Sequence, residues 1–293
     1  MAGPVVVGFD GSPASVTAAW WAAGEAVHRH LPVLLLHSWT TQPLDVPIAQ
    51  EAFGKQCYGG RVLQRMEAEL LHRYGGLSLV TAVVSDPASK ALVDAGDSAT
   101  MLVVGSRGHG TMAGFLLGSV SLHVLGLARC PAVTVRADDP AVEDGWGHPA
   151  AADRQEIVVG VQESGPAADP LLEFAFTAAD LRGARVRAVR ALPLSSLVTH
   201  PHAGRPNEGY EADERARLTA AVAPWQAKFP DVDVVDHVAR GSAAQILLAA
   251  SAHSMLTIVG RRRHPPPLTG KLGSVAHAAL HHVPCPVAVV PHD

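Results

Sequence analysis

Short hydrophobic runs alternate along this chain with longer stretches in which apolar residues recur every three or four positions. The short runs are rich in valine and leucine and are bounded by glycine or proline. Runs of this kind indicate strands that are buried on both faces, as in a parallel sheet covered by helices. For the first half we expect strands at 4–9, 32–38, 77–84, 100–105 and 131–136, with helices at 13–30, 55–74, 87–98 and 119–128. Their alternation predicts a doubly wound α/β fold.

The second half repeats the first. The run PVVVGFDGS at 4–12 corresponds to EIVVGVQES at 156–164, and MLVVG corresponds to MLTIVG with a stagger of one residue, which aligns Gly105 with Gly260. A period of about 150 residues is that of a duplicated domain, because solenoid repeats are much shorter. Strands are accordingly expected at 156–161, 185–191, 232–239, 255–260 and 286–290.

We therefore expect two tandem α/β domains, at 1–140 and 153–293, each with a five-stranded parallel sheet in the order 3-2-1-4-5 between helices. The stretch between them, 137–155, is rich in alanine, aspartate, proline and glycine and lacks apolar periodicity. Such a composition is typical of a linker.

Composition narrows the function classes. With 293 residues, 48% hydrophobic and 17% charged, the chain has enough apolar sequence for two ordinary cores. It has no apolar run that could cross a bilayer and no secretory signal pattern, so we expect a cytoplasmic protein without a membrane partner. The net charge of -4 gives no reason to expect a nucleic-acid partner. Three scattered cysteines without a CxxC spacing indicate reduced thiols.

The stretch GSRGHGTMAGFLLGSVS at 105–121 has the features of a phosphate-binding loop. It follows a predicted strand and runs into a predicted helix, whose first backbone N–H groups and positive dipole end favour an anion. We expect Gly105 and Gly108 to allow close approach and positive φ, Gly118 to allow a tight helix start, and Ser119 to cap the helix or donate to a phosphate.

Asp10 follows the first strand directly. In the order 3-2-1-4-5 the sheet reverses between strands one and four, so Asp10 and Gly105 would flank one crevice. A carboxylate there can accept hydrogen bonds from ribose hydroxyls or from the adenine amine. The alternative is a turn or helix cap within Asp10-Gly11-Ser12-Pro13.

Together with these motifs, LLLHSW at 34–39 and CPAVTVR at 130–136 make the chain resemble the universal stress protein family, and specifically its tandem-domain members, over nearly its whole length. The resemblance implies an ATP ligand, alone or with Mg²⁺, whose base and ribose lie near Asp10 and Ser38. Its phosphates would lie along the loop and the helix start. The nucleotide contacts expected from the pattern are Gly8, Asp10, Ser38, Val104, Gly105, Gly108, Gly118, Ser119 and Val120 in the first half, and Gly160, Gly260, Gly273, Ser274 and Val275 in the second.

The resemblance also implies a stress or dormancy role in which nucleotide occupancy sets a conformation or a partner contact, with at most slow ATP hydrolysis. Family members pair through the final strand, which implies pairing of the two domains within one chain and a homodimer of chains. Two other functions stay open at this point: an adenine-nucleotide transferase or hydrolase on a related fold, and an interaction module that binds no nucleotide.

The second half departs from the motif. Gln162 stands where the first half has Asp10, Arg263 stands where it has Gly108, and 265–267 are three prolines. These changes predict weaker or altered nucleotide binding there. A guanidinium can also grip phosphate through paired hydrogen bonds, so an anion site at Arg263 is the alternative.

Other catalytic signatures are missing from the sequence. It contains no GxSxG, GxxxxGK[ST] or HExxH pattern. Its sixteen histidines show no zinc-ligand spacing, so we expect no catalytic residue and no protein-bound metal site.

Overall fold

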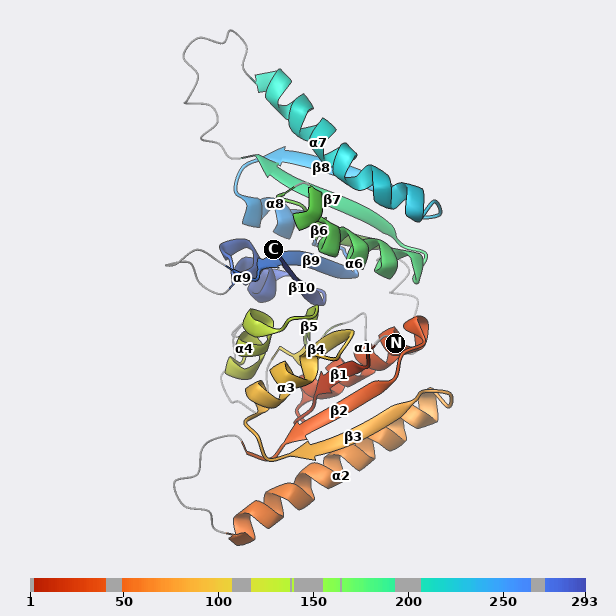
Figure 1. Ribbon diagram of the computed structural model, residues 1–293, viewed down its shortest axis with the longest axis vertical. Helices are drawn as coiled ribbons and strands as arrows, with labels where there is room; N and C mark the ends of the chain where they lie inside the picture. The colour runs from red at the N-terminus through yellow and green to blue at the C-terminus, as the bar shows by residue number, and fades with distance from the viewer. Residues whose placement is uncertain are drawn as a thin grey trace. The chain divides into compact units, whose positions relative to one another are not determined.

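A computed structural model describes residues 3–40, 49–106, 117–137, 139, 155–163, 165–192, 207–264 and 272–293 (Figure 1). The chain divides into two compact units, Met1–His148 and Pro149–Asp293. Within the described ranges, no helix combines the length and the apolar character that crossing a membrane requires.

The first unit is a parallel sheet with helices on both faces. Its strand order is β3-β2-β1-β4-β5, as predicted. Helices α1 and α2 pack on one face, and α3 and α4 pack on the other (Figure 1). The elements are β1 Val5–Gly8, α1 Pro13–Arg29, β2 Val33–Ser38, α2 Ala49–Arg73, β3 Leu79–Val84, α3 Ala88–Gly96, β4 Met101–Gly105, α4 Ser119–Leu127 and β5 Ala132–Val135.

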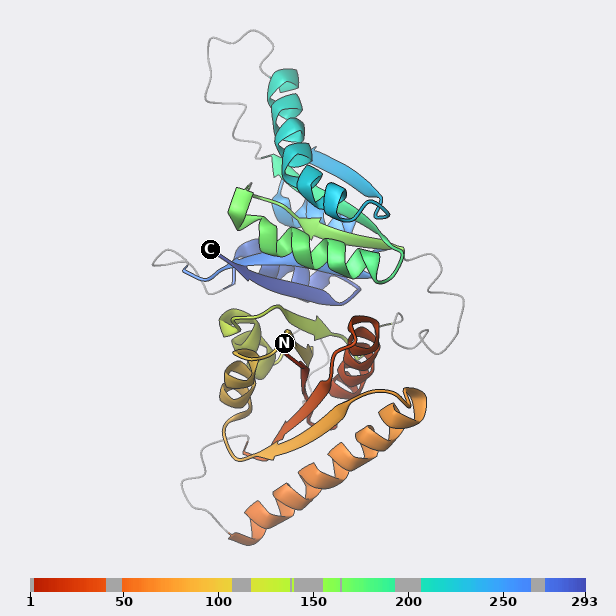
Figure 2. The same cartoon turned by 45° about the vertical axis from the view of Figure 1, so that its right-hand side comes forward.

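The second unit has the same architecture. Its strand order is β8-β7-β6-β9-β10, which is again 3-2-1-4-5 in the numbering of one domain. Helices α6 and α7 cover one face, and α8 and α9 the other (Figure 2). The elements are β6 Glu156–Gly160, a 3-10 turn Gly165–Ala167, α6 Asp169–Asp180, β7 Arg185–Leu192, α7 Asn207–Lys228, β8 Val234–Arg240, α8 Ala243–Ala250, β9 Leu256–Arg262, α9 Ser274–His282 and β10 Val287–His292. The predicted fold class is confirmed.

Two sets of boundaries differ from the expectation. Helix α2 begins at Ala49 and not near 55, because the stretch before Gly54 consists of good helix formers and a single glycine does not stop a helix. Strands β9 and β10 each extend two residues beyond the predicted ends at 260 and 290. The apolar runs end before polar residues such as Arg262 and His292, so the sequence pattern did not predict these extensions.

The core of each sheet is mainly apolar. Strand β1 contributes Val5, Val6 and Val7, each with no exposed surface, and β4 is buried along its whole length. Helix α1 turns a face of buried alanines toward this sheet, and small side chains let the helix backbone lie close to the strands. The close packing of α1 becomes important at the edge where the strands end.

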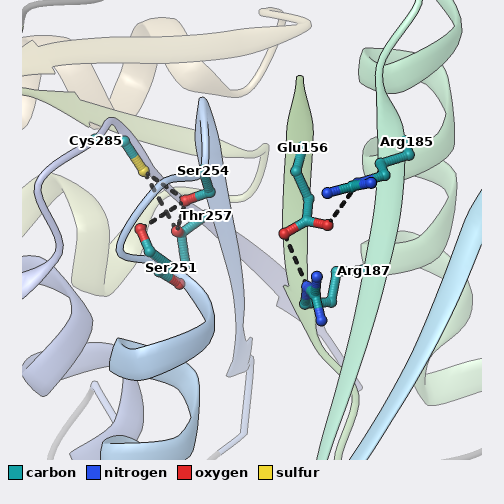
Figure 3. A network of polar contacts seen from close by, with 7 residues as sticks. All are labelled: Glu156, Arg185, Arg187, Ser251, Ser254, Thr257 and Cys285. Atoms are coloured by element: carbon teal, nitrogen blue, oxygen red, sulfur yellow. Dashed lines mark hydrogen bonds and ion pairs between the residues drawn. The ribbon is translucent and has the colours of Figure 1, made fainter. Parts of the chain in front are cut away.

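Figure 3 shows two polar clusters in the second unit. At the start of β6, the carboxylate of Glu156 accepts from Arg185 and Arg187, each at 2.8 Å. Burial alone would raise the pKa of Glu156, but the hydrogen bonds and charges of these arginines outweigh it and lower the pKa. The cluster ties β6 to β7 at the edge opposite the strand ends that carry the predicted motif.

The second cluster surrounds a buried thiol. Cys285 is 1% exposed, and its sulfur lies 3.2 Å from the hydroxyl of Ser254 and 3.4 Å from that of Thr257. The two hydroxyls are 3.1 Å apart, and Ser254 also donates to the carbonyl of Ser251 at 3.0 Å. This network links α8, β9 and the start of β10 in the interior of the unit.

Candidate functional site

The predicted site residues of the first half lie at the carboxyl edge of the sheet, where its strand order reverses. Strands β1 and β4 are parallel neighbours, and Gly8 is in register with Val104. The chain leaves β1 toward Asp10 and leaves β4 after Gly105. Chains that leave two adjacent parallel strands toward opposite faces open a crevice between them, the usual place for a ligand in such folds.

Asp10 lies in a turn that fixes its side chain. The amide of Ser12 donates to Asp10 Oδ1 at 2.9 Å, and Gly11 has φ +81°. Ser12 then caps α1 by accepting from the amide of Ser15 at 3.3 Å. The turn expected as the alternative role of Asp10 is therefore present. It holds the half-buried carboxylate at the sheet edge through one of its oxygens.

Ser38 ends the neighbouring strand β2 at the same edge. Its hydroxyl lies 2.6 Å from the carbonyl oxygen of Asp86 and 3.1 Å from that of Thr40, so it can donate to one of them. A hydroxyl that donates to a carbonyl keeps its lone pairs as acceptors. Ser38 can thus accept a hydrogen bond from a ligand hydroxyl or amine without breaking its protein contact.

Sequence reasoning missed His37 and Tyr58, which flank this edge. His37 is buried, and its Nδ1 lies 2.8 Å from the carbonyl oxygen of Phe9. Tyr58 contacts His37 edge-on with ring centroids 6.5 Å apart, and its hydroxyl lies 3.4 Å from the point where a Cβ on Gly11 would be. The HSW segment was a signal for His37, whereas Tyr58 comes from the long helix α2 and left no local signal.

The first and last residues of the predicted phosphate loop meet. The amide of Ser106 donates to Val135 at 2.7 Å, and the amide of Gly118 donates to the carbonyl of Ser106 at 2.9 Å. Ser121 donates from its hydroxyl to the carbonyl of Gly105 at 2.8 Å. The loop itself, including Gly108, lies outside the described residues. Its closed base holds the start of α4 next to the end of β4.

The start of α4 has the form that an anion site needs. Its N-cap is Gly118, with φ −65° and ψ 150°, and no side chain makes a capping hydrogen bond there. Ser119 and Val120 form the exposed first turn. Backbone N–H groups in a first turn have no partner within the helix, and they favour a phosphate or carboxylate.

Gly105 is a glycine for a reason other than the expected one. A Cβ at this position would lie 2.7 Å from the backbone carbonyl carbon of Ala14 in α1. Positive φ was expected for Gly105, and this expectation is wrong, because the residue lies in β4; the described glycines with positive φ are Gly11, Gly165, Gly183 and Gly241. Close packing of α1 on the strand end excludes any side chain there.

The predicted residues of the second half come together around a cavity of about 430 Å³. Gly160, Gly260, Gly273, Ser274 and Val275 all line it. Its walls are mainly apolar and come from β6, β7, β9, α6 and α8, with Val161, Leu171, Val189, Ala191, Leu247 and Val259 among them. The volume falls within the range of small-molecule pockets.

The charges at this cavity differ from those of the first half. Gln162, in place of Asp10, is exposed on its lining, and Glu163 is bound by Arg262, whose Nε donates at 3.1 Å. Arg261 also lines the cavity and is only 7% exposed. Burial lowers the pKa of Arg261, and the positive charge of Arg263 lowers it further.

Arg263 lies at the end of an extended strand. Its amide donates to the carbonyl of His292 at 2.8 Å, and its guanidinium lies 3.6 Å from the carboxylate of Asp293. In the first half the corresponding strand ends at Gly105, so the chain leaves the sheet later here. The prolines at 265–267 lie outside the described residues.

The two halves carry different residues at one equivalent position of their second strands. Strand register aligns His37 with Arg190. His37 packs over Gly59, where a Cβ would lie 2.8 Å from Nε2, whereas Arg190 forms a buried ion pair with Glu214 at 2.7 Å. The two halves therefore differ in chemistry at this position of the strand.

Among the described residues, no group of three or more histidine, cysteine, aspartate or glutamate side chains could hold a metal ion.

Comparison with known proteins identifies the family. The family model "Universal stress protein family" matches residues 1–136 and 154–291. A universal stress protein of Mycolicibacterium smegmatis is 31% identical over 98% of this chain and 96% of its own length, and one of Mycobacterium tuberculosis is 32% identical over 97% and 96%. The crystal structure of a universal stress protein from Archaeoglobus fulgidus covers 99% of this chain and 98% of its own, with a TM-score of 0.74 and 18% identity. The chain belongs to the universal stress protein family and carries two such domains in tandem.

Proposed function

We propose that this protein binds ATP in its first half and that nucleotide occupancy sets a conformation or a partner contact in a stress or dormancy response. One observation carries the proposal: Asp10 and the uncapped start of α4 belong to one edge of a universal stress protein domain, at the reversal of strand order. A carboxylate and a helix start together suit a ligand that has hydroxyls at one end and phosphates at the other.

The roles of the residues follow from their chemistry. Asp10 and Ser38 would accept hydrogen bonds from the ribose or the base. The first amides of α4, after Gly118, would donate to the phosphates, and the Ser119 hydroxyl would add a donor. Mg²⁺, where present, would arrive on the ATP phosphates and neutralise part of their charge. Any hydrolysis would be slow, and we assign no residue as catalytic.

The second half is proposed to bind ATP more weakly than the first. Gln162 supplies no charged acceptor, and Glu163 adds a carboxylate to the cavity wall where the first half has Gly11. A triphosphate would meet this carboxylate or have to separate it from Arg262. The repulsion by Glu163 and the loss of its ion pair with Arg262 both oppose binding of a polyanion.

We also propose that the chain forms a homodimer and that its domains pair through their last strands. Within its own domain, the last strand is at one end of the five-stranded order. The end of a sheet exposes backbone N–H and C=O groups that another strand can satisfy. Sedimentation equilibrium would give twice the chain mass for the dimer, and the mass of a single chain would contradict it.

Thermal unfolding with and without ATP tests the ligand. Binding stabilises a protein by about 2.7 kcal/mol at a hundredfold excess of ligand over Kd, so ATP should raise the Tm of nucleotide-free protein. Asp10→Asn keeps the oxygen that accepts from Ser12 and removes the charge, so it should reduce the shift. Gln162→Asn is the matched control in the second half and should leave the shift intact.

Two results would contradict the proposal. The first is an unchanged Tm at saturating ATP in the wild-type chain, and the second is an equal shift in Asp10→Asn and wild type. Rapid ADP release that is lost in Asp10→Asn would instead favour an adenine-nucleotide hydrolase or transferase.

A further inference from the structure

We propose that the cavity of the second half binds a nucleoside monophosphate in preference to a nucleoside triphosphate, so that the two halves of the chain respond to different nucleotides. The proposal rests on the proposed function in one respect: it assumes that both halves use the same edge of the domain. It is carried by the cavity, by the buried arginine on its wall and by the carboxylates around it.

The cavity can hold a ring system. Its volume is about 430 Å³, and most of its wall is formed by valine, leucine and alanine side chains. Burial of an aromatic base or of a nucleoside against such a wall is favoured by the hydrophobic effect. The neutral amide of Gln162 can accept from or donate to the polar rim of that group.

Two features of the wall favour a negative charge. Arg261 brings a largely buried guanidinium to the lining. Gly273, Ser274 and Val275 line the same cavity at the start of α9, where the N-cap makes no side-chain hydrogen bond. A Cβ on Gly273 would meet none of the described atoms within 4 Å. A single phosphate suits these two features of the wall.

Further phosphates would meet carboxylates. Glu163 lies on the wall and is bound by Arg262. Asp293 lies 3.6 Å from the guanidinium of Arg263. These arginines are thus already neutralised in part by acidic partners, and a β- or γ-phosphate would repel the partners or displace them.

A pair of blocking substitutions isolates each site. Gly118 and Gly273 are N-caps with nearly the same backbone conformation, which an aspartate can adopt. An aspartate N-cap accepts from the first helix amides, stabilises the helix and repels a phosphate. Gly118→Asp should leave only the second-half site, and Gly273→Asp only the first-half site. Gly118→Asn and Gly273→Asn are the matched neutral controls, and circular dichroism melting verifies folding.

Isothermal titration calorimetry of the nucleotide-free full chain with AMP and with ATP, each in Mg²⁺ buffer, is the test. In Gly118→Asp we expect AMP to bind at one site per chain, about tenfold or more tighter than ATP. Gly273→Asp should weaken that AMP binding about tenfold more than Gly273→Asn does. Loss of AMP binding in Gly118→Asp, an ATP affinity equal to that for AMP, or equal effects of the aspartate and asparagine variants would overturn the inference.

The outcome for the first half is independent. Failure of Gly273→Asp to bind ATP would contradict the proposed function and leave the AMP preference in Gly118→Asp to be judged by its own titration. ATP binding in Gly273→Asp without an AMP preference in Gly118→Asp would refute only the further inference.

Discussion

Replacement of Gly105 by alanine should destabilise the first half of the chain even without any ligand. The added methyl would lie 2.7 Å from the backbone carbonyl carbon of Ala14 and 2.9 Å from its carbonyl oxygen. Ordinary van der Waals contact of a Cβ starts near 3.4 Å. Helix α1 would have to move outward by several tenths of an ångström, and a backbone cannot swing away as a side-chain end can.

The cost follows from what overpacking does in other cores. Inserting a methyl into a well-packed interior costs about 1–3 kcal/mol. We expect about 2 kcal/mol for Gly105→Ala, because the obstacle is backbone. Gly260→Ala is the matched control from the equivalent strand position. Its closest obstacle is the imidazole of His292, at 2.8 Å, which can rotate toward solvent, so less than about 1 kcal/mol is expected.

Hydrogen exchange in increasing urea, analysed by mass spectrometry of peptides from each half, measures the two costs separately. Peptides of β1 and β4 should lose protection at lower urea in Gly105→Ala, whereas peptides of β6 and β9 should shift little in Gly260→Ala. Equal costs for the two substitutions would refute the packing explanation, and so would an unchanged first half.

Three further predictions concern packing, charge and thiol access. Gly59→Ala should destabilise the first half by about 1–3 kcal/mol, since its Cβ would overlap the buried His37, and His37→Ala should relieve most of that loss in a double-mutant cycle of urea unfolding. Glu156→Gln should cost about 1 kcal/mol at pH 7. The folded-state pKa of Glu156 lies below the ordinary 4.5, so the higher unfolding free energy of the wild type holds above that pH and fades as the pH falls below it. Unfolding measured across an acid titration can follow this change. A wild-type advantage that persists fully at low pH would contradict the ion pairs. Iodoacetamide at pH 8 should label exposed Cys57 first, because burial raises the pKa of Cys130 to about 11, and peptide mass spectrometry that finds Cys130 labelled equally fast would be a contrary result.

The fold could be predicted because its signals are local. Buried valine and leucine runs such as Val5–Gly8 and Met101–Gly105 mark central strands wherever they occur, and the internal repeat doubles the information. The order 3-2-1-4-5 then follows from the preferences of doubly wound sheets.

Parts of the site could not be predicted, because they depend on contacts between distant residues. The need for glycine at 105 comes from Ala14 on another element, and the pairing of Arg262 with Glu163 joins residues 99 positions apart. The extension of β9 depends on its pairing with β10. The residues at the ends of both strands are polar, so their sequence does not indicate a buried strand.

For the second half, comparison of the two copies predicts altered nucleotide binding, and this stays a prediction. Gln162 and Arg263 indicated an altered site, and the structure adds a cavity with apolar walls and its own ion pairs. The backbone of Arg263 is bonded to β10 and its side chain lies near Asp293, and an anion site at this residue stays the alternative.

Equilibrium dialysis of radiolabelled ATP against nucleotide-free full chain tests the central claim most directly. The proposed function predicts one tight ATP site per chain, which Asp10→Asn weakens and Gln162→Asn leaves intact. Two equal tight sites per chain, or none, would contradict it.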